Sequence, residues 1–521
     1  MVRVVVGNRR CGWGVWAGVL IPVLRTPRPL VLAAFLALAT PVVCPAAASA
    51  QGPDDPTTAV RAAPAELQDV RGRLVERVRR GESPSFAVGV VRGAEVEWAE
   101  AIGWANREAK AAATPDTRYA VASVSKSLTA TGAMALVGRG RLRLDTSADP
   151  VLASGRRRGT WTGSASLAQL LDHMSGLPHA WHYEYPDRPE TVVTRARLIH
   201  DNAFVALPPG RHFLYTNLGY GVVAELVERA EGAPFQRVME RVLFAPLDMR
   251  GTTVDAWVGK GTTARGYERD GRAIPYELRL APDGGAGFFS TLDDLLRYCR
   301  FHLGFLERPE IPRDAVITSA LRSARPGVHY LRGWGVVRLD SVAVLISDGQ
   351  MSGASAAVVL VPERDLGAVV LCNATGCPAM ETATEILSAL VPGLEDSLNA
   401  AWPRLERKLF PPGTIPTEQF EGTLLERDAM VRLKADLVGG TVTVFRSWPD
   451  MYRLEDVHWS VGAVEGVLLP ATRPVGRDVP HEILLRLWRV GNELRGVLQE
   501  EIMDDRPGYA RVSGVVLRPV R

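Results

Sequence analysis

The chain has 521 residues, of which 46% are apolar and 23% are charged. This balance predicts a globular protein with a large core and more than one domain, and it excludes a chain that is disordered by composition. The 61 basic and 58 acidic residues give a net charge of +3 and form no long runs of one sign, so the electrostatic footprint of a nucleic-acid-binding protein is missing. We therefore expect a small-molecule or peptide partner and no nucleic acid.

The first fifty residues have the pattern of an export signal. Five arginines precede an uncharged apolar run from Leu30 to Val43, and Ala48-Ser49-Ala50 matches a cleavage pattern. The alternative is a retained membrane anchor, although the run is short for crossing a bilayer. We predict a signal peptide over residues 1–50 and an exported protein, periplasmic or extracellular, which would contact a membrane only if this segment is retained.

Three cysteines follow the predicted signal peptide, namely Cys299, Cys372 and Cys377. Such an odd and sparse set does not make a disulfide framework, and none of the three lies in a C-x-x-C or other metal-binding pattern. Cys372 and Cys377 could form a local bridge, but we favour buried thiols for both.

The N-terminal part of the mature chain begins with a segment that has no periodicity. Residues 51–65 are rich in Pro, Asp, Thr and Ala, which predicts a linker. Apolar residues at helical spacing from Leu67 to Val78 then predict an amphipathic helix. Residues 85–91 and 95–102, separated by a Gly-containing turn, predict a strand pair. A helix followed by antiparallel strands favours an α+β domain.

A long helical stretch follows position 123, and turns and helices alternate to about residue 300. Strand-like runs then return at residues 333–339, 342–346, 356–361 and 366–372, before a helix at residues 381–390. This order lets N-terminal and C-terminal strands share one sheet. We therefore predict one α+β domain over residues 66–400, with Ser123 where the helical middle meets the sheet.

The pattern changes again in the C-terminal part. We predict a linker at residues 401–414, which contains Pro411-Pro412-Gly413, and an antiparallel β domain over residues 415–521. Apolar and charged residues alternate from Val431 to Leu437, and residues 491–493 form a hairpin signal between two strand-like runs. We interpret this domain as a small barrel, and we expect that it can be removed without loss of the preceding fold.

One lysine stands out in a chain that contains only five. Lys126 follows Ser123 by three positions, and positions i and i+3 share one face of a helix. A desolvated, neutral lysine could take the proton from the Ser123 hydroxyl as it attacks a carbonyl, whereas an arginine would keep its own proton. A lone S-x-x-K pattern arises easily by chance, so this hypothesis needs support from other parts of the chain.

Three further segments provide that support. They are L-L-D-H-M-S-G-L-P at residues 170–178, P-P-G at residues 208–210 followed by Y-T-N-L-G-Y at residues 215–220, and the segment that starts with D-G-Q at residues 348–350 and runs to Ser355, which we expect to open a strand. With the S-x-x-K pattern they resemble the penicillin-binding and serine β-lactamase superfamily, specifically its class C-like branch of D-alanyl-D-alanine peptidases, esterases and β-lactamases. The resemblance spans roughly residues 66–400. It implies an antiparallel sheet flanked by helices, with an all-helical subdomain.

The resemblance assigns roles to four side chains. It implies that Ser123 is the nucleophile, Lys126 its base and Tyr215 a second proton-handling group, and that Asn217 contacts the substrate amide. A phenol beside an ammonium group should have a lowered pKa, so we expect Lys126 and Tyr215 to titrate as a coupled pair. The alternative for Tyr215 is a core tyrosine with a satisfied hydroxyl.

The resemblance also implies an oxyanion hole made by the backbone N–H groups of Ser123 and Gln350, with Gly349 allowing close approach of the strand. One position departs from the family, because Ser347 stands where its members hold Lys or His. The missing cation removes a partner for a substrate carboxylate. This disfavours β-lactamase and carboxypeptidase activity more than esterase activity, unless Arg332 or another arginine supplies the charge.

Other residues near these segments have plainer interpretations. We expect His173 to be a structural loop histidine rather than a general base. His179 and His182 lie on a Pro-flanked loop, which disfavours a metal site. The aromatic residues between positions 181 and 185 either line the pocket or pack within the loop. Residues 284–287 lack the Lys-Ser/Thr of a phosphate-binding loop and predict a turn.

Together these patterns predict an exported serine hydrolase that forms an acyl-enzyme on Ser123 and needs no metal or cofactor. Its substrate would be a short-chain ester, a D-amino-acid peptide or a β-lactam, and a cell-wall fragment would fit this class. The alternative is a non-catalytic binder or sensor of the penicillin-binding type that uses the same pocket.

Overall fold

The computed structural model describes residues 56–399 and 415–520, here called the main domain and the β domain. Short gaps interrupt these ranges at residues 154–163, 186, 255–261, 275–278, 314–316, 319–320, 322–326, 340–341, 427–428, 440, 446–448, 461–462, 471–482 and 503–508. The predicted signal peptide and the predicted linker at residues 401–414 lie outside the described residues. Within the described ranges, no helix is both long enough and apolar enough to cross a membrane.

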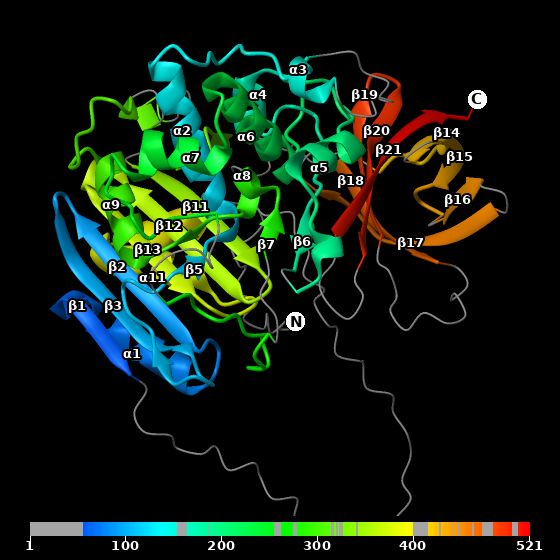
Figure 1. The fold of residues 1–521 in the computed structure, drawn as a ribbon. Helices are drawn as coiled ribbons and strands as arrows, with labels where there is room; N and C mark the ends of the chain where they lie inside the picture. Colours follow the sequence, from blue (N-terminus) through cyan, green and yellow to red (C-terminus); the bar gives the residue numbers. More distant parts are fainter. Residues whose placement is uncertain are drawn as a thin grey trace, which may run out of the picture.

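A large antiparallel sheet forms the centre of the main domain, with the strand order β1-β3-β2-β13-β12-β11-β10-β9 and β4 paired to β3. The strands are β1 (Thr57–Arg61), β2 (Ser85–Arg92), β3 (Glu95–Asn106), β4 (Ala111–Ala112), β9 (Gly327–Leu331), β10 (Trp334–Arg338), β11 (Ala343–Met351), β12 (Ala354–Val361) and β13 (Leu366–Cys372). Strands β2 and β13 are neighbours, with Val88 opposite Val370. N-terminal and C-terminal strands therefore share one sheet, as predicted (Figure 1).

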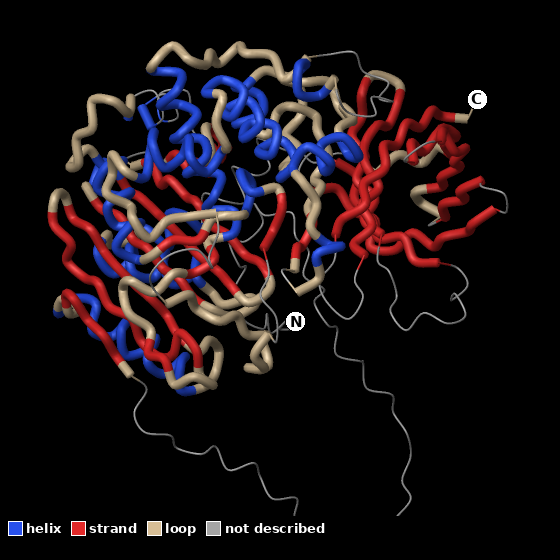
Figure 2. Tube along the Cα trace, in the orientation of Figure 1, coloured by secondary structure: helices blue, strands red, loops and turns tan. Residues whose placement is uncertain are grey.

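The two faces of this sheet bury against different helices. Successive residues of β13 alternate between the faces, as expected for a strand buried on both sides. Val369 belongs to the same buried cluster as α9 (Leu292–Leu303), and Val370 belongs to the cluster that contains α1 (Gln68–Arg79) and α11 (Ala379–Leu390). Helices thus cover the sheet on both sides (Figure 2).

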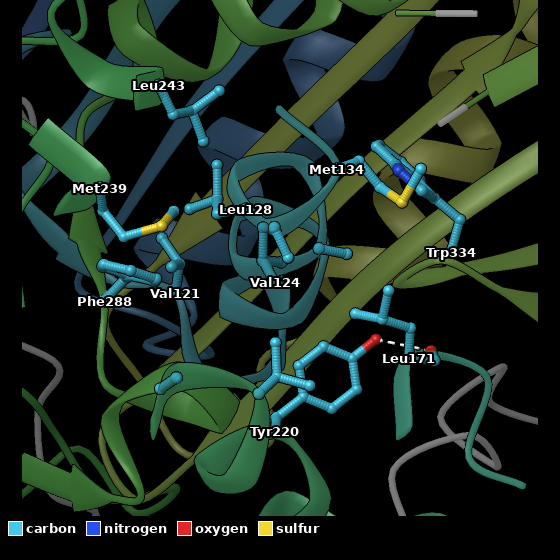
Figure 3. Packing of buried hydrophobic residues seen from close by; sticks show 14 of the residues in the cluster. Val121, Val124, Leu128, Met134, Leu171, Tyr220, Met239, Leu243, Phe288 and Trp334 are labelled. Atoms are coloured by element: carbon cyan, nitrogen blue, oxygen red, sulfur yellow. Dashed lines mark hydrogen bonds between the residues drawn. The ribbon is translucent and has the colours of Figure 1, made fainter. Parts of the chain in front are cut away.

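A further group of helices lies in the main domain, together with a two-stranded sheet of β5 (Tyr119–Ala120) and β8 (Phe289–Ser290). The helices are α2 (Ser125–Gly138), α3 (Asp149–Leu152), α4 (Leu167–Leu171), α5 (Arg195–Asn202), α6 (Asn217–Glu231), α7 (Phe235–Met239) and α8 (Asp283–Ala286). Every residue of α2 from Ser125 to Leu136 is buried, so this helix runs through the interior rather than along a surface. Figure 3 shows Leu128 and Met134 of α2 among core side chains from other elements, including Leu243 and Trp334.

The β domain is a closed antiparallel barrel. Its strands are β14 (Gln419–Glu426), β15 (Ala429–Asp436), β16 (Thr441–Phe445), β17 (Pro449–Ser460), β18 (Ala463–Pro470), β19 (Ile483–Val490), β20 (Glu493–Ile502) and β21 (Tyr509–Pro519). Each strand pairs with the next, and β14 also pairs with β21, which closes the ring. The predicted hairpin around residue 491 is confirmed as β19 and β20. Apolar side chains such as Leu487 and Leu517 form one buried cluster of the barrel.

The barrel is joined to the main domain by a shared sheet and by a shared core. Strand β21 pairs with β6 (His182–Glu184), which pairs with β7 (Arg279–Ala281), and Figure 1 shows β6 and β7 on the side of the main domain that faces the barrel. Four barrel residues, Ala463, Trp488, Val497 and Val512, belong to the buried cluster of the helical group. This packing speaks against a barrel that can be removed without consequence.

Two boundaries predicted from the sequence differ in the structure. Residues 57–61, inside the predicted linker 51–65, form β1, whose mostly exposed side chains carry no apolar periodicity but whose backbone pairs with β3. The D-G-Q segment at residues 348–350 ends β11 instead of opening a strand. The chain then turns and returns along β12, so this motif lies at one end of a hairpin.

Candidate active site

Ser123 lies in a short helical turn, η3 (Ala122–Val124), directly before α2. Ala122 has a φ of +43°, which is uncommon for a residue with a Cβ and costs free energy. Because its neighbours are buried while Ser123 itself is partly exposed, this conformation presents the hydroxyl at the surface of an otherwise closed core. The position matches the accessible helix start predicted for the nucleophile.

Lys126 lies one turn further along and is fully buried. Its Nζ atom lies 3.0 Å from Ser123 Oγ, 2.6 Å from Asn217 Oδ1 and 2.8 Å from the carbonyl oxygen of Gly285. Burial lowers the pKa of Lys126 well below its usual value, and the nearby charge of Asp348 opposes this shift. A neutral amine can donate to Asn217 and Gly285 and keep its lone pair for the Ser123 hydroxyl proton.

Tyr215 contacts the same oxygen from another side. Its hydroxyl donates to Ser123 Oγ at 2.9 Å, and Lys126 Nζ lies over its ring, 4.6 Å from the centroid. The prediction that an ammonium group lowers the pKa of Tyr215 is wrong, because burial raises this pKa. The same burial disfavours the ammonium form of Lys126, the cation that would have stabilised a phenolate. Tyr215 is therefore a neutral hydrogen-bond donor to Ser123.

Asn217 is placed by the start of α6. Thr216 is the N-cap of this helix, and its hydroxyl accepts from Gly219 N at 3.0 Å. Asn217, the first helical residue, is 3% exposed and accepts from Lys126 through its side chain. The motif residues at positions 215 and 217 thus converge on Ser123 and Lys126, although about ninety positions separate them in the chain.

Two imidazoles satisfy the first backbone N–H groups of α6. Thr216 N donates to His173 Nδ1 at 3.1 Å, and Asn217 N donates to His179 Nδ1 at 3.2 Å. Burial lowers the pKa of His173 well below its usual value and that of His179 to about 3. Both rings are neutral acceptors, which fits the structural role expected for His173. The role of His179 has no counterpart in the sequence analysis.

The end of β11 lies against the backbone around Ser123. A Cβ on Gly349 would lie 2.5 Å from Ser123 N and from the carbonyl oxygen of Val121, closer than backbone atoms tolerate. Glycine is thus required for contact with the backbone around Ser123. In the described ladder, β10 pairs with β11 only up to Ile346, so the stretch that contains Gln350 lies beyond β10. The N–H groups of Ser123 and Gln350 remain the predicted oxyanion donors.

Ser347 is 4% exposed, and its hydroxyl donates to Ser127 Oγ at 3.1 Å. Arg332 was the alternative source of the missing cation. Its backbone N–H donates to Asp172 Oδ1 at 2.8 Å and its guanidinium forms an ion pair with the same carboxylate. The charge of Arg332 is thus balanced by Asp172 and does not replace the cation that the family holds at the position of Ser347.

Residues 284–287 act differently from the simple turn that the sequence predicts. They belong largely to α8, which packs against α2 and α6. The carbonyl of Gly284 accepts from Thr129 Oγ1 at 2.8 Å, and that of Gly285 accepts from Lys126. Gly285 has no side-chain signal in the sequence because the residue acts through its backbone carbonyl, and only the run of adjacent glycines marks the place.

The loop after residue 178 is packed rather than open. Trp181 and Tyr183 belong to a buried cluster that also contains Ala122, Met351 and the barrel residue Ala510. His182 stacks on Tyr509 of the barrel with ring centroids 5.3 Å apart. Among the described residues, no group of three or more potential ligands could hold a metal ion.

The hydroxyl of Ser123 contacts the buried amine of Lys126 and the hydroxyl of Tyr215. This site lies between an antiparallel sheet and a group of helices. Fold and site together are those of the penicillin-binding class of proteins. Residues 70–391 match the model of the Beta-lactamase family. The chain therefore belongs to the Beta-lactamase family.

Curated relatives carry two names. A D-aminopeptidase of Brucella canis is 26% identical over 233 residues, which are 42% of this chain and 43% of the relative. The chain thus spans less than half the length of this D-aminopeptidase. A Beta-lactamase of Pseudomonas fluorescens is 23% identical over 364 residues, which are 62% of this chain and 95% of the relative.

Solved structures show the same fold. The octameric penicillin-binding protein homologue from Pyrococcus abyssi superposes with a TM-score of 0.53 at 20% identity, covering 85% of this chain and 100% of that one. SurE superposes with a TM-score of 0.55 at 22% identity, covering 88% and 99%. A further structure of SurE, with D-Leu, gives 0.55 at 21% identity, covering 88% and 100%.

Proposed function

We propose that the protein is an exported serine hydrolase that cleaves an ester or amide through an acyl-enzyme on Ser123. One observation carries this proposal. Ser123 Oγ lies 3.0 Å from the buried amine of Lys126 and 2.9 Å from the hydroxyl of Tyr215. A hydroxyl that lies between a neutral amine and a neutral phenol can lose its proton to the first while it is oriented by the second.

The reaction needs no group from outside these residues. Ser123 Oγ attacks the substrate carbonyl as its proton passes to Lys126 Nζ, and a tetrahedral intermediate forms. The backbone N–H groups of Ser123 and Gln350 stabilise the oxyanion. The C–N or C–O bond then breaks, and the leaving group takes the proton from Lys126, with Tyr215 placed to relay it. Water repeats the sequence on the ester of Ser123 and regenerates the hydroxyl.

The substrate class follows from the position of Ser347. A neutral side chain at this place favours substrates without a carboxylate next to the scissile bond, such as short-chain esters or neutral amides. A D-aminopeptidase among the relatives, and a structure of SurE with D-Leu, support peptides or esters of D-amino acids within this class. We rank these substrates above penicillins and D-alanyl-D-alanine peptides.

Export is part of the proposal. Cys372 and Cys377 form a disulfide, contrary to the buried thiols that the sequence favours, whereas Cys299 is a free buried thiol. Disulfides persist mainly in oxidising compartments. The bridge supports the periplasmic or extracellular location that the N-terminal pattern suggests. Sequencing the N-terminus of the protein recovered from its native host tests this part.

Covalent labelling of the full chain tests the catalytic part. A fluorophosphonate should label wild type and not Ser123→Ala, and wild type should hydrolyse a nitrophenyl ester at a rate that Ser123→Ala lacks. Residual turnover of more than a few per cent in Ser123→Ala would contradict the assignment of the nucleophile.

The departure at Ser347 gives a second candidate, a binder that is acylated but does not turn over. Intact mass after incubation with penicillin or with the ester separates the two candidates. A lasting adduct without product release would favour the binder, and no adduct with rapid product release would favour the hydrolase.

A further inference from the structure

His179 connects the barrel side of the molecule to the active site. The side chain is 5% exposed, and its Nδ1 atom accepts from Asn217 N at 3.2 Å. A neutral imidazole that accepts through Nδ1 carries its proton on Nε2. Nε2 is buried and has no hydrogen-bond partner among the described residues. Within the part of the chain that the structure describes, the ring therefore makes a single hydrogen bond, to the backbone N–H of Asn217, whose side chain accepts from Lys126.

Asn217 depends on that bond because it is held at two points. Its Oδ1 atom accepts from Lys126 Nζ at 2.6 Å, and its backbone N–H is the one that His179 satisfies. The N–H groups at a helix start have no partner within the helix. Without the His179 ring, the buried backbone N–H group of Asn217 would have no acceptor, which costs free energy. Asn217 could then move away from Lys126.

The loop that carries His179 is held by the barrel. Trp181 O accepts from Ala510 N at 3.1 Å, and His182 pairs with Tyr509 at the start of β21. The position of the His179 ring is therefore set from two sides, by α6 and by the barrel.

We propose that His179 is a positioning residue that sets the place of Asn217 and, through it, the hydrogen bond from Asn217 to Lys126. The barrel is a part of this support because it holds the loop. This inference rests on the proposed function, since the consequence appears in acylation of Ser123. His179 acts through Nδ1 only, and Nε2 has no part in the reaction.

Three substitutions at His179 distinguish a role of Nδ1 from a role of Nε2. Asn carries an oxygen near the place of Nδ1, Gln carries its amide near the place of Nε2, and Leu carries neither. In full-length protein, His179→Asn should keep most of the kcat for a nitrophenyl ester, whereas His179→Gln and His179→Leu should lose about tenfold or more, with KM changed less. His200→Asn on α5, where the imidazole is half-exposed, is the matched control and should leave kcat unchanged.

Equal loss in all three His179 variants, or wild-type kcat in His179→Leu, would overturn the proposal. Thermal melting of each variant separates misfolding from mispositioning.

A second measurement does not depend on turnover. Nitrogen-15 NMR of histidine-labelled wild type should show His179 neutral and protonated on Nε2 between pH 5 and 8, and a proton on Nδ1 or titration in this range would overturn the inference. A wild type that hydrolyses no ester would contradict the proposed function, while the NMR result would still test His179.

Discussion

At the scale of single residues, burial decides the chemistry of Lys126. Removing an ammonium group from water disfavours its charged form, and for this side chain desolvation is the largest influence on its pKa. The side chain accordingly has partners that suit an amine, namely a hydroxyl, an amide oxygen and a carbonyl. The charge of Asp348 opposes this shift.

The first prediction concerns this charge. Lys126→Arg should lower kcat/KM for an ester nearly as much as Lys126→Ala, by about 100-fold or more, because general bases typically contribute that much and arginine cannot release its proton. Steady-state hydrolysis and the rate of fluorophosphonate labelling measure the effect. Near-normal acylation in Lys126→Arg would show that the side chain supplies only positive charge.

The second prediction concerns Ser347, whose hydroxyl contacts Ser127. Ser347→Lys and Ser347→His should raise kcat/KM for a D-alanyl-D-alanine peptide by about ten- to a hundredfold, the value of one charge-assisted hydrogen bond of roughly 1.5–3 kcal/mol. The kcat/KM for a nitrophenyl ester should not increase.

The site is buried, so a melting curve must accompany each variant of Ser347. Ser127→Ala is the matched control, because it removes the partner hydroxyl without adding a charge. Equal change for both substrates, or a wild type that already prefers the peptide, would contradict the prediction.

At the scale of elements, the site depends on the contact between η3 and the end of β11. These elements are more than two hundred positions apart, yet Gly349 touches the backbone of Ser123. The strained φ of Ala122 lies at the same contact. The sheet edge and the start of α2 thus form one unit that fixes Ser123 relative to the expected oxyanion donors.

The third prediction tests this contact. Gly349→Ala should slow acylation of Ser123 by about tenfold or more and lower stability by about 1–3 kcal/mol, because the new Cβ meets backbone atoms that cannot turn aside. Gly72→Ala on α1 is the control, since nothing lies within 4 Å of a Cβ there. Labelling rates and urea unfolding give the two readouts. Wild-type behaviour of Gly349→Ala would mean that β11 is free to move away from Ser123.

At the scale of the whole molecule, the barrel and the main domain share a core. Trp488 is 2% exposed and belongs to the cluster of the helical group, while its neighbours Leu485 and Leu487 belong to the barrel cluster. Strand β19 therefore buries one face inside the barrel and part of the other against the main domain, as the alternation of a strand allows.

The fourth prediction is that the main domain is less stable without the barrel, contrary to the expectation from the sequence. A chain ending at residue 402 should aggregate or melt at a lower temperature than the full chain, because it exposes the apolar surface that the barrel covers. In the full chain, Trp488→Ala should cost about 3–5 kcal/mol, and Arg489→Ala, on the exposed neighbour, should cost little. A soluble truncated chain with wild-type melting and ester turnover would restore the idea of two independent domains.

The sequence by itself determined the parts of this protein that depend on local pattern. Strand alternation and helical spacing identified β2, β3, β13, α11 and the β19–β20 hairpin, because backbone hydrogen bonding and the hydrophobic effect act on neighbouring residues. The order of the motifs was enough to bring Ser123, Lys126, Tyr215 and Asn217 together, since their spacing repeats that of a known family.

Only the tertiary structure decided what depends on burial and on contacts between distant segments. The direction of the Tyr215 pKa, the carbonyl of Gly285 on Lys126 and the bond from Asn217 to His179 all follow from packing that no local pattern contains. The Cys372–Cys377 bridge and the barrel contacts of Trp488 belong to the same group. Desolvation and hydrogen bonding are set by the atoms that surround a group in space, and most of those atoms here come from far along the chain.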